Sequence, residues 1–132
     1  MHKPIVLGAA VLAAAGLAAA PSAGAGSDGD GGNEVIKRGG CTAASTWKLK
    51  AKHDDGRIET EFEVDQNRVG KRWRVVLRQD GRVVFRGIRT TRAPSGSFEV
   101  RRFLRHTAGS DRIVGRARAL ATGEICRGVV TI

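Results

Sequence analysis

Tyrosine is absent from this 132-residue sequence, which has two tryptophans, two cysteines, one methionine and three prolines. We expect both tryptophans, Trp47 and Trp73, in the interior of the fold, because each lies on the apolar side of an alternating pattern. The sequence then has no exposed aromatic platform of the kind that sugar-binding and single-strand-binding proteins display. It also contains no HExxH or CxxC motif and no Gly-rich phosphate loop. We therefore predict no cofactor and no metal site.

The residues of nucleophilic and acid–base catalysis are equally sparse. After the N-terminal segment only two histidines remain, His53 and His106. Neither has the serine or cysteine nucleophile and orienting acid that a catalytic triad requires. Ser95 and Ser97 flank a turn and are interpreted as turn residues. We therefore expect no catalytic residues and a protein that is not an enzyme.

The one long hydrophobic run follows a short basic start, Met1-His2-Lys3, and covers residues 5–20. It is shorter than the roughly 20 apolar residues that a membrane-spanning helix needs. Small residues at Ala23 and Ala25 are typical of a signal-peptidase site, so residues 1–25 are predicted to be a signal peptide cleaved after Ala25. The expected protein is secreted, with no transmembrane segment after cleavage.

The mature chain has about a hundred residues, the size of one domain. Residues 26–40 are rich in glycine and polar side chains and are predicted to be a flexible leader. Residues 41–132 then form the domain. Two cysteines in an exported chain of this size indicate one disulfide, Cys41–Cys126.

Strict apolar–polar alternation marks two strands at 47–52 and 58–65, joined by Asp55-Gly56, the preferred pair for a type I′ hairpin turn. This turn sets Lys52, Lys50 and Lys48 opposite Glu59, Glu61 and Glu63, and Leu49 opposite Phe62. Every charged pair is then opposite in sign, and a shift by one residue would place lysine against an apolar side chain. The lysines should therefore form a neutralised, solvated face.

Five further strands are predicted at 72–78, 82–91, from Phe98 onward, at 112–119 and at 125–132. The loop after the first of these is expected to have three residues with a bulge at Gly81, which sets Val75 opposite Phe85 and Leu77 opposite Val83. A second bulge is expected at 101–102. Seven short strands with regular turns predict an all-β antiparallel sandwich. The first and seventh strands then run in the same direction, which brings both cysteines to one end of the sandwich.

The strand pattern over residues 41–132 resembles the immunoglobulin-like class, most closely the fibronectin type III arrangement. Trp73 lies on the third strand, where many such domains have a core tryptophan, and residues 111–117 resemble the sixth strand. Ile113 stands where a corner tyrosine is common. Residues 54–64 and 98–102 also resemble small secreted proteins of high-GC Gram-positive bacteria, which implies no particular activity.

The net charge is +10, and 17 of the 23 basic residues are arginine. If the third, fourth, sixth and seventh strands share one sheet, its outer face is basic and also has a valine stripe. The candidate polyanion-binding residues are Arg72, Arg74, Arg86, Arg116, Arg118 and Arg127. The candidate interaction stripe is Val76, Val84, Val114 and Val129. Two hypotheses follow: a module that binds anionic cell-envelope polymers or other polyanions, and a protein-interaction or self-associating module. A third interpretation is a solvated basic surface without a partner.

Overall fold

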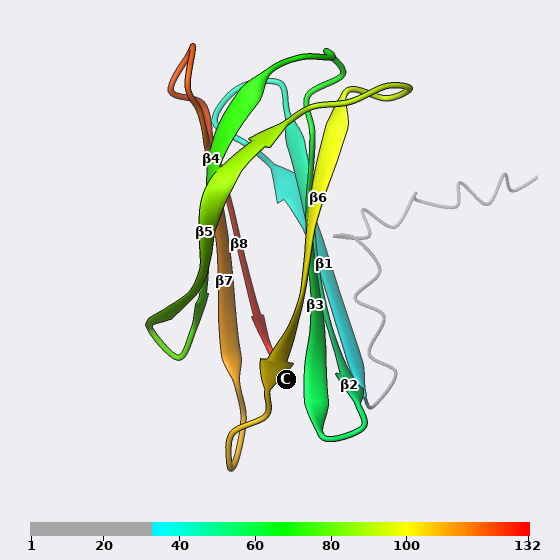
Figure 1. Cartoon of the computed structure of the whole chain (residues 1–132), viewed down its shortest axis with the longest axis vertical. Helices are drawn as coiled ribbons and strands as arrows, with labels where there is room; N and C mark the ends of the chain where they lie inside the picture. The colour runs from blue at the N-terminus through cyan, green and yellow to red at the C-terminus, as the bar shows by residue number, and fades with distance from the viewer. Residues whose placement is uncertain (1–32) are drawn as a thin grey trace, which may run out of the picture.

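The computed structural model describes residues 33–132, and the predicted signal peptide and residues 26–32 lie outside them. Eight strands form two antiparallel four-stranded sheets, packed face to face as a β-sandwich (Figure 1). Sheet A has the order β1-β2-β3-β6, and sheet B has the order β5-β4-β7-β8. The strands of sheet A are β1 (Glu34–Gly40), β2 (Thr46–Asp54), β3 (Arg57–Asp65) and β6 (Ser97–Arg105). Those of sheet B are β4 (Arg72–Gln79), β5 (Arg82–Thr90), β7 (Arg112–Ala119) and β8 (Ile125–Thr131). No helix in residues 33–132 is long and apolar enough to cross a membrane.

The first hairpin confirms the predicted register residue by residue. Lys48, Lys50 and Lys52 pair with Glu63, Glu61 and Glu59, and Leu49 pairs with Phe62. Asp55 and Gly56 have φ values of 49° and 76°, as a type I′ turn requires. The charge pattern on one face and the apolar pattern on the other therefore select the same pairing.

The second hairpin differs from the prediction. Asp80 and Gly81 both have positive φ and form a two-residue turn, so Gln79 pairs with Arg82. The register shift lies further along, between Leu77 and Arg78 of β4, and it sets Leu77 opposite Phe85. The prediction of a three-residue loop with a bulge at Gly81 was therefore wrong. A bulge inside β5 matches buried residues with buried residues just as well as a bulge at the turn, so burial alone did not decide between them.

The expected bulge at residues 101–102 is also absent, because β6 pairs with β3 in one continuous register. Leu104 is therefore the buried residue, whereas Phe103 points outward and is 44 % exposed. Arg102 occupies the inward position between Val100 and Leu104, opposite Thr60. An arginine at an inward position misled the alternation argument.

An eighth strand, β1, replaces part of the predicted flexible leader and moves the start of the domain to before Cys41. Val35, Lys37 and Gly39 pair with Ala51, Leu49 and Trp47. Gly39 is required there because a Cβ atom at this position would lie 2.7 Å from the Trp47 ring. The strand was missed because its inward positions hold one valine, one lysine and one glycine, which give no apolar alternation.

The core lies between the two sheets. Trp73, Phe62 and Leu49 are fully buried at its centre, together with side chains from every strand except β1 and β5. Trp47, predicted to be core, is partly buried and packs over Gly128 of β8. The Cys41–Cys126 disulfide is confirmed, with Cα atoms 4.3 Å apart, and it ties the residue that directly follows β1 to β8 across the sheets.

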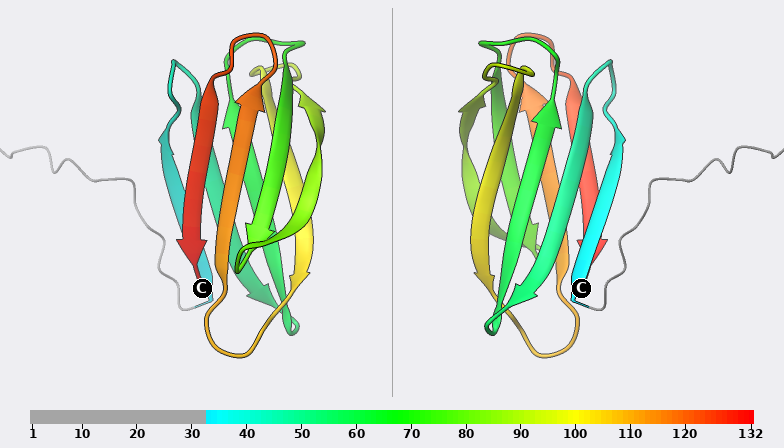
Figure 2. Two further views of the ribbon diagram at one scale, coloured as in Figure 1. Left: turned by 90° about the vertical axis from the view of Figure 1, so that its left-hand side faces the viewer. Right: turned by 90° about the vertical axis from the view of Figure 1, so that its right-hand side faces the viewer.

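Figure 2 looks at each sheet face on: β8 and β1 lie at one side of the sandwich, and β5 and β6 lie at the other. The side between β5 and β6 is joined by the turn after β5 and by few other contacts. The four edge strands of the sandwich are thus arranged in two pairs.

Candidate functional site

The outer face of sheet B brings together the six predicted arginines. Cross-strand pairing places Arg74 beside Arg118, and Val76 between Arg86 and Arg116. Arg116 in turn pairs with Arg127 on β8. All six side chains, including Arg72 at the start of β4, are exposed. The condition on which the basic face depended is met, because β4, β5, β7 and β8 form one sheet.

This face has no compensating negative charge. The four strands of sheet B contain ten arginines and no aspartate or glutamate. Within residues 33–132 every salt bridge lies on sheet A or in the loop between β6 and β7. Like charges directly opposite each other on neighbouring strands destabilise a sheet. An anion placed over Arg74, Arg116 and Arg118 would relieve that repulsion.

The acidic residues nearest to sheet B are occupied by hydrogen bonds to the protein. Asp80 accepts a bond from the backbone N–H of Arg112. Glu124 accepts bonds from the N–H groups of Ala43 and Ser45 and from the Ser45 hydroxyl. These carboxylates tie loops together at the ends of the sheet, and neither forms a salt bridge with the arginines of the outer face.

Asp111 is fully buried at the opposite end of β7 from Glu124. Burial alone would raise its pKa, but hydrogen bonds from Thr107, Gln79 and His106 outweigh that effect, so the pKa of Asp111 lies below its ordinary value. His106 Nδ1 lies 2.7 Å from Asp111 Oδ2. The His106 and His53 rings meet edge-on, with their centroids 4.7 Å apart. The sequence reasoning missed this cluster, because its members lie on separate segments. The spacing of His106 and Asp111 around a turn was the only local signal.

The valine stripe is only partly assembled. Val114 and Val129 are paired on the outer face next to Arg78, but Val114 is just 9 % exposed. Val84 does not belong to the stripe: the shift between Leu77 and Arg78 leaves it packed against the core. Val83 lies opposite Arg78 instead and is 45 % exposed. The apolar component of this face is therefore small.

Sequence reasoning also missed members of the basic face. Arg78 pairs with Val114, and Arg112 pairs with Thr131, so both lie on the outer side. Ile88 pairs with Arg74 and is 36 % exposed there. Alternation could have placed both residues, since Arg78 follows the buried Leu77 and Ile88 lies two positions beyond the outward Arg86.

No three histidine, cysteine, aspartate or glutamate side chains within residues 33–132 are grouped so that they could hold a metal ion. The chain matches no family model, no curated protein and no solved structure.

Proposed function

We propose that this chain is a secreted, non-catalytic module that binds anionic cell-envelope polymers or other polyanions through the outer face of sheet B. The observation that carries the proposal is the absence of any acidic residue on four adjacent strands that bear ten arginines. A guanidinium group presents several N–H donors in a planar fork that matches phosphate geometry. Arg74, Arg118 and Arg116 project from adjacent strands, so one extended chain of phosphates could contact all three.

The frame that holds this face is proposed to be immunoglobulin-like. Without β1, the remaining strands divide into a three-stranded sheet, β2-β3-β6, and a four-stranded sheet, β5-β4-β7-β8. That division matches the fibronectin type III arrangement, and Trp73 lies buried on the third of these seven strands. In this proposal β1 is an addition at the edge of the smaller sheet.

A protein-interaction or self-associating module is the second hypothesis. It would rely on the valine stripe as an interface core with the arginines as a rim. Its support is weaker, because Val84 packs inward and Val114 is almost covered, which leaves Val76 and Val129 among charged neighbours. Sedimentation of the purified protein across a concentration series distinguishes it, since only self-association makes the molecular mass depend on concentration.

The salt dependence of binding tests the first proposal. A linear polyphosphate is titrated into the protein at several salt concentrations. Six phosphate contacts predict a slope of log K against log salt of about −4, and hence a loss of a few hundredfold between about 50 and about 200 mM salt. A slope near zero, or no binding at the lowest salt concentration, would reject the polyanion-binding function.

A further inference from the structure

Two partly buried arginines stand at inward positions of the sandwich, where alternation calls for apolar side chains. Arg89 of β5 pairs with the fully buried Trp73, and Arg102 of β6 pairs with Thr60. The Thr60 hydroxyl is itself buried and has no hydrogen-bond partner among residues 33–132. Departures from local sequence rules concentrate at functional or strained sites. The open side between β5 and β6, defined here as the β5–β6 seam, is such a place.

The guanidinium groups of Arg89 and Arg102 both stack on the Phe85 ring. The guanidinium carbon of Arg102 lies 4.4 Å from the centroid of the Phe85 ring, and that of Arg89 lies 4.9 Å from it. Each group uses one donor on a neighbouring carbonyl oxygen, Arg89 on Ile88 at 3.1 Å and Arg102 on Arg101 at 2.8 Å. A guanidinium has five N–H donors, so most donors of both groups remain available. Stacking on Phe85 thus orients two cations without neutralising them.

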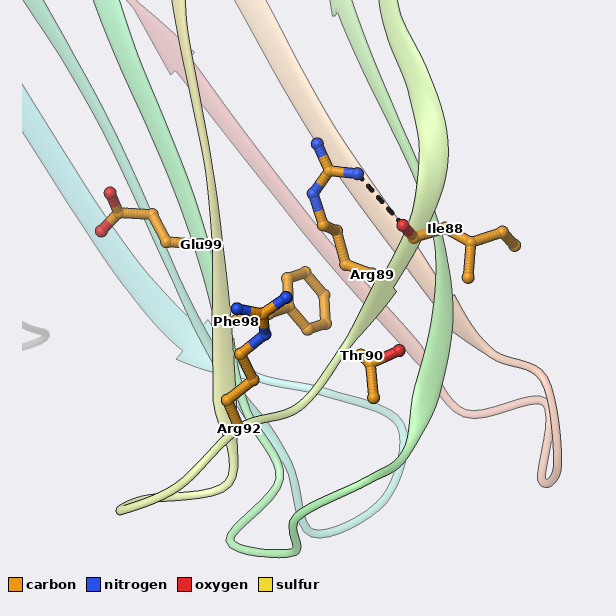
Figure 3. Close-up of a pocket in the computed structure, with 6 residues that line it drawn as sticks. All are labelled: Ile88, Arg89, Thr90, Arg92, Phe98 and Glu99. Carbon is orange, nitrogen blue, oxygen red and sulfur yellow. Dashed lines mark hydrogen bonds between the residues drawn. The ribbon is translucent and has the colours of Figure 1, made fainter.

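Beside Arg89 lies a cleft of about 440 Å³, lined by Ile88, Arg89, Thr90, Arg92, Phe98 and Glu99. Figure 3 shows Arg89 and Arg92 extending into the space between β5 and β6, whereas Glu99 points away from both. Glu99 pairs with Glu63 on the outer side of sheet A. None of Arg89, Arg92 and Arg102 forms a salt bridge within residues 33–132.

We infer that the β5–β6 seam is a site for a single phosphate group, held by Arg89 and Arg102 and closed on one side by Arg92. The site is separate from the outer face of sheet B, because Arg89 and Arg102 occupy inner-face positions. It deepens the proposed function by adding a subsite for one phosphate, whether this belongs to a polymer or is free in solution. The ring and the cleft wall exclude water from part of the anion, which strengthens its attraction to the arginines.

The test is a titration of the full chain with inorganic phosphate at low salt, followed through the Nε–H resonances of the arginines. Saturable shifts are expected at Arg89, Arg92 and Arg102. The double variant Arg89→Gln/Arg102→Gln should weaken phosphate binding about tenfold or more, since charge-assisted hydrogen bonds to an anion are roughly twice as strong as neutral ones. The outer-face control Arg74→Gln/Arg118→Gln removes the same charge and should change the affinity less than about twofold.

A third variant keeps the test valid if the double variant does not fold. Arg89→Lys/Arg102→Lys keeps both charges but removes the planar forks, so it should still lose several-fold in phosphate affinity. Equal losses in the seam and outer-face variants, or shifts confined to the outer face, would overturn the seam site. Shifts at the seam that do not saturate would also overturn the site. In that case Arg89 and Arg102 only shield the edge of the hydrophobic core from water.

Polyphosphate separates this inference from the proposed function. If the outer face binds polymer but the seam does not bind phosphate, the seam variant retains polyphosphate binding and shows no phosphate response. If only the seam binds, the control variant Arg74→Gln/Arg118→Gln retains both responses. Each proposal can therefore fail without the other.

Discussion

The two sheets of this sandwich pack their inner faces against each other, but their outer faces differ in charge. Sheet A has nine basic and seven acidic residues on its strands, and Lys50 and Arg101 form ion pairs there with glutamates. Sheet B has ten arginines and no acid. On sheet A, burial raises the pKa of the Glu99 carboxyl, and the nearby carboxylates of Glu61 and Glu63 raise this pKa further. The comparison indicates that the net charge of the chain does not show where a polyanion could bind until the charges are assigned to each outer face.

The largest expected effect comes from cutting the covalent link between the two sheets. The Cys41–Cys126 disulfide spans 85 residues. Replacing both cysteines with alanine should lower the free energy of unfolding by about 4 kcal/mol, because the unfolded chain regains the entropy of a long loop. Denaturant unfolding of both proteins measures this. A loss below about 1 kcal/mol would mean that packing alone joins the sheets.

The next effect concerns packing between the sheets. Gly115 of sheet B lies under Phe62 of sheet A, and a Cβ atom there would be 2.8 Å from the ring. Gly115→Val should therefore cost roughly 2–3 kcal/mol through overpacking. Gly40→Val is the matched control, because a Cβ at Gly40 meets nothing within 4 Å. Equal unfolding midpoints for the two variants would contradict the inter-sheet contact.

A smaller effect separates turn geometry from surface charge within sheet A. Gly56 has a φ of 76°, so Gly56→Val should cost roughly 1–2 kcal/mol through strain in the left-handed region. Lys50→Ala removes two long, half-buried ion pairs, at 4.0 and 3.7 Å, and should cost less than about 1 kcal/mol. Thermal unfolding ranks the two variants. The reverse order would show that the charges, and not the turn, hold the β2–β3 register.

The smallest effect is a pH dependence at the loop that connects the sheets. Since hydrogen bonds from Thr107, Gln79 and His106 lower the pKa of Asp111 in the folded state, its carboxylate stabilises the fold above the ordinary value of 3.8. That contribution is lost as the pH falls through the folded-state pKa. Asp111→Asn should therefore unfold at a lower temperature than the wild type near pH 7, with a gap that narrows below pH 3.8. A gap independent of pH would assign the effect to packing.

The same contrast explains how much of the fold could be predicted. The β2–β3 register followed from the sequence because lysines face glutamates on one side while Leu49 and Phe62 face each other on the other. In sheet B every charge has the same sign, so only burial could align β4 with β5, and burial did not locate the bulge. The inward Arg102 and the weakly apolar β1 broke the alternation on which strand prediction depends.

The candidate site was predicted in the same uneven way. Arg72, Arg74, Arg116, Arg118 and Arg127 followed from alternation along regular strands, and Arg86 retained its outward position beyond the bulge. Val84 did not, because it lies at the irregularity itself. The seam arginines could not be found, since Arg89 and Arg102 come together only when the edges of two different sheets meet.

The central claim is that polyanion binding depends on which face carries the charge. Two triple variants of equal charge test it directly: Arg74, Arg86 and Arg116 to Gln on sheet B, and Lys48, Lys50 and Lys52 to Gln on sheet A. At moderate salt the arginine variant should lose about tenfold or more in polyphosphate affinity, while the lysine variant should change by less than about twofold because each of these lysines stands opposite a glutamate of β3. Equal losses in the two variants would contradict the account and reduce binding to an effect of net charge.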